Sequence, residues 1–90
     1  MLTRTSILEQ AARCVTTDRA AAHGDVEELF AQIAAVWSCR TGVTITPAQV
    51  ALMMIDLKVC RAWNNPRHDD NWIDIAGYAA CGGEVVSKTP

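Results

Sequence analysis

The chain has 90 residues, of which 50% are apolar, and a formal net charge of −2 at pH 7. These values predict one folded domain over residues 1–90 rather than a disordered chain. Duplex nucleic acid is not an expected partner, because phosphate neutralisation needs clustered Lys and Arg. No apolar run approaches the ~20 residues of a membrane span, and the N-terminal stretch MLTRTSILEQ lacks the apolar core of a signal peptide. We therefore expect a cytoplasmic protein that does not contact a membrane.

The apolar content is high for so short a chain. A small helical domain with this much apolar surface, including three Trp, often covers the surplus in an oligomer, so we expect at least a dimer. The four Cys are spread along the sequence without a C-x-x-C pair, which is not the spacing of a zinc ribbon.

Four segments have helical periodicity, and the first is predicted over about 7–16. Ser6 followed by Glu9 is a capping-box pattern that marks its start. Its apolar side chains share one face: Ile7, Leu8, Ala11, Cys14 and Val15. The pattern predicts an amphipathic helix.

The second helix is predicted over about 26–41, after the polar connection TTDRAAAHGD. Asp25 is suited to cap its N-terminus, and Glu28 occupies the reciprocal position of a capping box. Gly42 is suited to end it, because glycine readily adopts the left-handed conformation found at helix C-termini.

The third helix has the clearest start signal in the sequence and is predicted over about 47–63. Thr46 caps it, Pro47 takes the first helical position, and Gln49 completes the capping box. The stretch NNPRH breaks the helix.

The fourth helix is predicted over about 70–81. Asp69 or Asp70 caps it, and the pair Gly82 and Gly83 ends it. The remaining EVVSKTP is expected to be loose, or a short strand or arm docked on a neighbour. Four helices joined by short loops predict an all-α four-helix bundle.

One face of the fourth helix gathers oxygen atoms that suit a metal ion. Asp70, Asp74 and Tyr78 follow one another at four-residue steps. Two acids and a phenol on one face can bind Mg²⁺, which takes oxygen ligands and usually keeps several waters. The alternative is that Asp70 only stabilises the helix N-terminus and Asp74 is solvated.

Basic residues lie on a stripe of the third helix. Met54, Lys58 and Arg61 are separated by steps of four and three. A Lys beside apolar neighbours needs a partner for its ammonium group or must reach outward to water. If the third and fourth helices are antiparallel neighbours, Asp74 or Asp70 is the natural partner. Lys58 is then either a phosphate-binding cation beside the acids or half of a structural ion pair.

Other charged residues near the start of the second helix are candidates for the same site. Glu28 either completes a carboxylate cluster with Asp70 and Asp74 or serves in its own helix cap. In the preceding loop, Arg19 suits bidentate contact with phosphate. His23 beside a glycine can stack on a base or cap the turn.

Three stretches in this order resemble a known family: ILEQAARCVTTDRAAAHGDVEELFAQIAAVW, ITPAQVALMMIDLKVCR and DDNWIDIAGYAA. They span about Ile7 to Ala80 and look like a small phage and prophage family of unassigned function. That family is similar to the MazG-like all-α nucleotide pyrophosphohydrolases. The most specific piece is DNWIDIAGY, residues 70–78, and the DRAAAHGD loop and the LKVCR helix end occur in the matching order.

The resemblance implies a helical bundle that forms a homodimer or homotetramer, located in the host cytoplasm if phage-encoded. It implies Mg²⁺ on helix carboxylates and a nucleoside triphosphate cut between its α and β phosphates. The matching motif carries the metal-ligand role to Asp70 and Asp74, with Asn71 beside them. The chain departs from the family at the E-x-x-E pair of the preceding helix, where MMIDLK supplies one acid and Lys58.

Three functions therefore stay open. The first is a Mg²⁺-dependent pyrophosphohydrolase in which Asp70 and Asp74 hold metal, Lys58 neutralises phosphate charge and Arg19 contacts the triphosphate. The second is a non-catalytic module that binds or sequesters a nucleotide, in which the basic residues, including Arg61, matter more than metal. The third is a structural or interaction bundle.

Overall fold

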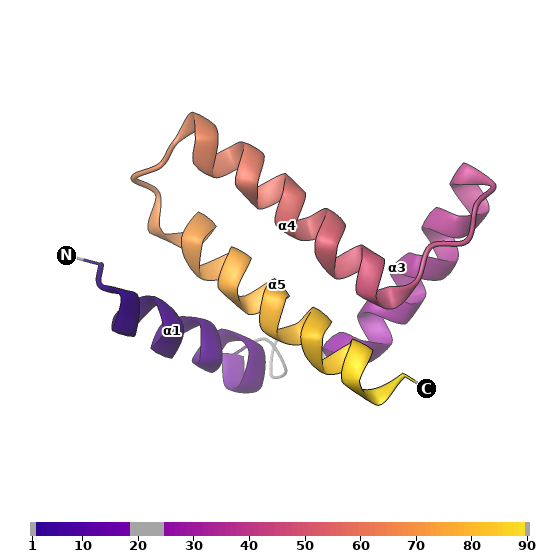
Figure 1. The fold of residues 1–90 in the computed structure, drawn as a ribbon, viewed down its shortest axis with the longest axis horizontal. Coiled ribbons are helices and arrows are strands. Elements are labelled where there is room, and N and C mark those ends of the chain that lie inside the picture. The colour runs from indigo at the N-terminus through magenta and orange to yellow at the C-terminus, as the bar shows by residue number, and fades with distance from the viewer. Residues whose placement is uncertain (1, 19–24, 90) are drawn as a thin grey trace.

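The computed structural model describes residues 2–18 and 25–89, which form four α-helices and one short π-helix (Figure 1). The elements are α1 (Arg4–Arg13), η1 (Cys14–Asp18), α3 (Val26–Thr41), α4 (Pro47–Asn64) and α5 (Asp69–Lys88). The predicted all-α class with four helices is confirmed. None of the helices described is both long enough and apolar enough to cross a membrane.

Helix α1 begins at Arg4, three residues before the predicted start. The Ser6 backbone N–H donates to Thr3 Oγ1 at 3.0 Å, and the Thr3 N–H donates to Ser6 Oγ at 2.9 Å. These reciprocal bonds satisfy N–H groups that a helix start leaves open. The prediction that Ser6 and Glu9 form the capping box is therefore wrong, because Ser6 is the third helical residue of a box that begins at Thr3. Beyond Arg13 the chain continues as the π-helix η1.

Helix α3 has the predicted bounds, Val26–Thr41. Asp25 caps it through Oδ1, which accepts a hydrogen bond from the Glu27 N–H at 3.0 Å. Gly42 ends it with a φ of 76°, in the left-handed region that glycine adopts without strain. A capping box with Glu28 is not formed in the described structure, where the Asp25 side chain accepts from the Glu27 N–H and no bond joins the Glu28 side chain to the Asp25 N–H.

Helix α4 starts where predicted and ends one residue later, spanning Pro47–Asn64. Thr46 and Gln49 form the expected capping box, with N···O distances of 2.9 and 3.2 Å. The turn before the helix is closed by a side chain of α3. Ser38 Oγ accepts from the Ile45 N–H at 2.8 Å and donates to the Ile45 carbonyl at 3.2 Å.

Helix α5 is longer than predicted, running through Asp69–Lys88. Gly82 and Gly83 do not end it, since neither has a positive φ. A Cβ added at Gly82 would lie 2.8 Å from the Cβ of Ala51, so this glycine allows α4 and α5 to approach closely. The expectation of a loose tail or strand after the glycines is wrong, as that stretch is helical to Lys88. The predicted Asp caps are also wrong, because Asp69 and the residue after it already lie in the first turn.

Helices α4 and α5 form an antiparallel hairpin, with α1 along α5 and α3 across the far end (Figure 1). The hydrophobic core lies where α3 meets the hairpin and is formed by Phe30, Ala34, Val50, Ala51 and Cys81. The Phe30 ring packs against Tyr78 with 6.2 Å between the ring centroids. Phe30 and Val50 are the large side chains that are fully buried in the described structure. The core of one chain is therefore small.

Candidate functional site

An ion pair joins the two helices of the hairpin. Lys58 Nζ on α4 lies 2.9 Å from Asp74 Oδ2 on α5, and the two side chains are 15% and 35% exposed. The antiparallel arrangement brings these positions together, so the expectation that a fourth-helix acid partners Lys58 is confirmed for Asp74. A partly buried ammonium group is stabilised by such a partner, because burial without one penalises the charge.

Asp70 does not join this pair. Its side chain is 75% exposed, and His68 Nε2 lies 3.9 Å from its Oδ2. Asp70 lies in the first turn of α5, where water reaches the carboxylate. Of the two aspartates that the sequence offers as partners for Lys58, Asp74 pairs with it and Asp70 does not.

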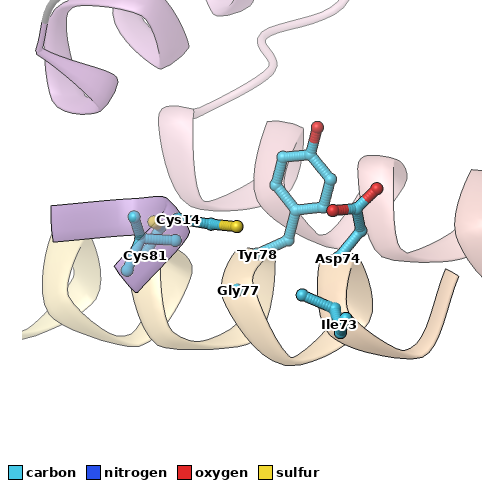
Figure 2. A pocket seen from close by; sticks show the side chains of 7 residues that line it. Cys14, Ile73, Asp74, Gly77, Tyr78 and Cys81 are labelled. Atoms are coloured by element: carbon cyan, nitrogen blue, oxygen red, sulfur yellow. The ribbon is translucent and has the colours of Figure 1, made fainter. Parts of the chain in front are cut away.

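Asn71 and Tyr78 lie one turn before and one turn after Asp74 on the same side of α5. Asn71 is only 4% exposed, and its amide offers both donors and an acceptor. Asp74 and Tyr78 project from α5 on one side, toward α4 (Figure 2). Beside them, Cys14 of η1 helps to enclose a cavity of about 20 Å³. A cavity of this size has room for about one water molecule.

Arg61 follows Lys58 by three residues on α4 and is exposed. Among the described residues no carboxylate lies within ion-pair distance of its guanidinium group. Its five N–H donors are therefore available for a planar anion such as phosphate. Arg61 and Lys58 place two basic groups along one stretch of α4, as the sequence predicts.

The predicted magnesium ligands do not converge. Glu28 is exposed on α3, Asp70 is exposed on the first turn of α5, and Asp74 already bonds to Lys58. Across residues 2–18 and 25–89, no group of three His, Cys, Asp or Glu side chains is placed to hold a metal ion. Glu28, Asp70 and Asp74 therefore do not form the three-carboxylate cluster that the sequence suggests, within the part of the chain that the structure describes. The other two predicted ligand-binding residues, Arg19 and His23, lie outside the described residues.

Sequence reasoning missed a second charged link. Lys88 Nζ lies 2.7 Å from Glu27 Oε1 and 2.9 Å from Glu84 Oε1. The hydrogen bonds to Glu27 and Glu84 hold the pKa of Lys88 above its usual range. Glu84 and Lys88 have the i, i+4 spacing of a helical ion pair, but Gly82 and Gly83 predict that the helix ends before them. No pattern in the sequence reveals the pairing with Glu27 on α3.

Proteins of two mycobacteriophages are similar to the chain. It is 44% identical over 75 residues to the Gene 55 protein of Mycobacterium phage L5, covering 82% of this chain and 48% of that protein. It is 37% identical over 76 residues to the Gene 55 protein of Mycobacterium phage D29, covering 84% of this chain and 50% of that protein. The chain thus spans about half the length of these relatives. No solved structure matches it.

A family described as a domain of unknown function, DUF6378, matches residues 6–86. The match extends from the first turn of α1 to the last turn of α5, and so includes the Lys58–Asp74 pair. Together with the phage relatives, it confirms the predicted resemblance to a phage family of unassigned function. The further similarity to MazG-like enzymes stays a prediction. The coverage of the match and the identity to the phage proteins show that the chain belongs to the DUF6378 family.

Proposed function

We propose that the protein is a nucleotide-binding module centred on Lys58 and Asp74. The observation that supports this most directly is the half-buried ion pair, which holds a lysine ammonium at a fixed place between two helices. Arg61, exposed three residues along α4, supplies a second cation for phosphate. Asn71 is only 4% exposed, so its amide is given no contact with the nucleotide.

Binding without hydrolysis is the form of the proposal that the described residues favour. Cleavage of a nucleoside triphosphate by the MazG-like route needs Mg²⁺ on several carboxylates, and no such cluster is present in the described part of the chain. The residues outside the described ranges include no Asp or Glu, so a pyrophosphohydrolase would have to obtain further carboxylates from beyond residues 1–90 or from a second chain. We place this module in the host cytoplasm, where nucleotides are available.

Calorimetric titration with ATP and with deoxynucleoside triphosphates tests the proposal. We expect binding that persists in EDTA and no release of pyrophosphate when Mg²⁺ is added. Arg61→Gln is expected to weaken binding by about tenfold, the effect of losing one charge-assisted contact. Arg40→Gln on α3 is the matched control, since Arg40 is exposed and distant from the pair. The nucleotide affinity of this variant is expected to equal that of the native chain.

Three results would count against this function. Absence of binding for every nucleotide removes it altogether. Pyrophosphate release that depends on Mg²⁺ and is lost in Asp74→Asn would show that the protein is a hydrolase rather than a binding module. Equal weakening by Arg61→Gln and Arg40→Gln would mean that charge alone, and not this site, attracts the nucleotide.

A structural or interaction bundle is the second candidate, and a different observation favours it. Ten large apolar side chains of the described structure are exposed, among them Trp63 at 86%. Exposed apolar side chains that gather into a patch often mark a site where a partner binds. In this case Asp74→Asn would change the stability of the protein but no response to nucleotides.

A further inference from the structure

An apolar groove runs along the outer side of the α4–α5 hairpin. Side chains that water reaches line it, namely Leu52, Val59, Trp63, Trp72 and Val86. Within the described structure, no Asp, Glu, Lys or Arg lines either of the two hollows in this groove. We refer to this surface as the α4–α5 groove.

Each end of the groove has a hollow, but the side chains around the two hollows differ in size. At the end next to the hairpin turn, the indoles of Trp63 and Trp72 flank a hollow of about 290 Å³. At the other end, a hollow of about 340 Å³ is lined mainly by small residues, including Ala79, Gly82 and Gly83. That volume lies in the lower range of pockets that take up whole small molecules, so it can accept an indole ring. The Trp63 side chain, which is 86% exposed, therefore projects beside one hollow, whereas small residues leave the other hollow open.

This shape is complementary to itself. Consider a two-fold axis that lies in the plane of the groove and crosses the hairpin near Ile75. Rotation about it turns two copies face to face and places the Trp63 end of each over the small-residue end of the other. The contact is isologous, with the same patch used twice. Because the groove lacks charged residues, the rotation brings no like charges together.

The size of the surface also fits a second copy. The exposed parts of the side chains in the α4–α5 groove amount to roughly 600–700 Å², close to the 800 Å² or so that each partner buries in a standard interface. The core of a single chain is small, with Phe30 and Val50 as its fully buried large side chains in the described structure. Small domains with such a core commonly gain stability by association.

We propose that the α4–α5 groove binds a second copy of this chain, with Trp63 of each protomer inserted beside Gly83 of the other. The contact is independent of the proposed nucleotide function, because neither Lys58 nor Asp74 lines the hollows of the groove. Nucleotide titration and self-association therefore give separate readouts, and either proposal can fail while the other holds.

Sedimentation velocity from low to high micromolar concentration tests this interface. We expect a dimer whose dissociation constant rises about 30-fold or more in Trp63→Ala, as for a central aromatic contact. Gly83→Leu is the sharper variant. A Cβ at Gly83 meets nothing within 4 Å in the single chain, so the variant is expected to fold, yet its side chain fills the hollow that receives the indole. Leu8→Ala is the control, since Leu8 is 64% exposed on α1, away from the groove.

The emission of Trp63 gives a second measurement, read in a variant whose other two tryptophans are replaced by Phe. We expect a blue shift with rising concentration and no such shift when Gly83→Leu is added. A chain that stays monomeric at every concentration overturns the proposal. Blue-shifted emission in that monomer would indicate that a segment of the same chain covers the groove. Dimerisation that Leu8→Ala weakens and Gly83→Leu leaves unchanged also overturns it, because the interface then lies on α1.

Discussion

Lys58 Nζ and Asp74 Oδ2 lie 2.9 Å apart across the α4–α5 hairpin, and the lysine is the less exposed partner, at 15% against 35%. Water therefore reaches the carboxylate more easily than it reaches the ammonium group. Removal of either residue leaves the other without its partner. Because Lys58 is less exposed than Asp74, water solvates its unpaired charge less well. The pair should thus respond unequally to substitution of its two members.

We expect Asp74→Asn to lower the free energy of unfolding by about 1–3 kcal/mol, because it leaves a largely buried ammonium without its counter-charge. Lys58→Met keeps the apolar stem and leaves a carboxylate that water can solvate, so we expect less than about 1 kcal/mol. Urea unfolding of both variants and of the double variant measures the coupling. Asp56→Asn, at an exposed position on α4, is the control. Equal losses of unfolding free energy in the two single variants would contradict the expected effect of the unequal burial.

Adjacent glycines in α5 are expected to respond in opposite directions to alanine. An added Cβ at Gly82 would lie 2.8 Å from the Cβ of Ala51, whereas at Gly83 it meets nothing within 4 Å. Gly82→Ala is expected to destabilise the protein by about 1–3 kcal/mol through overpacking. Gly83→Ala should stabilise it by about 0.5–1 kcal/mol through helix propensity. Thermal unfolding of the two variants at equal protein concentration tests this prediction. A higher melting temperature for both variants would mean that the hairpin adjusts at Ala51 to accommodate the added Cβ.

Stability is expected to fall at alkaline pH through Lys88. Its pKa is raised in the folded protein by Glu27 and Glu84, so the folded state favours the charged form. The stabilisation is complete below the unfolded-state pKa of about 10.4 and is lost as the pH rises above it, toward the higher folded value. Unfolding measured from neutral pH to pH 11 or so should show a smaller decline in Lys88→Met than in the native chain. An equal decline of the free energy of unfolding with pH in the two proteins would contradict the expected contribution of Lys88.

The turn between α3 and α4 should depend on one hydroxyl group. Ser38 Oγ accepts from the Ile45 N–H at 2.8 Å and donates to the Ile45 carbonyl at 3.2 Å. We expect Ser38→Ala to lower the free energy of unfolding by about 1–2 kcal/mol, because both backbone groups lose their partner. Ser87→Ala on the exposed end of α5 removes a hydroxyl that bonds only the Gly83 carbonyl, and it should change stability by less than about 0.5 kcal/mol. Hydrogen exchange at the Ile45 amide localises the effect.

Local signals in the sequence predict the middle helices well. Asp25 and Gly42 bound α3 as expected, and Thr46 with Gln49 forms the box that starts α4. In each case the cap bonds to the helix it begins or ends, so residues within four positions are sufficient to specify it.

The prediction for the last helix fails where tertiary contact overrides a local signal. Gly82 has the sequence pattern of a helix end, yet its lack of a side chain serves the close approach of Ala51. The same limit applies to the site. Spacing along a helix places Asp70 and Asp74 on one face, but only the position of α4 determines that Asp74 meets Lys58 while Asp70 stays in water.

The length of α5 has a consequence for how the chain is made. This helix contacts α1, η1, α3 and α4, and it leaves the ribosome after all of them. During synthesis the earlier helices lack the helix against which they all pack. The apolar side chains that will face α5 remain exposed to solvent until α5 emerges. Completion of the fold is therefore expected to wait for the final stretch of α5, so nascent chains stalled before Gly82 should remain sensitive to protease.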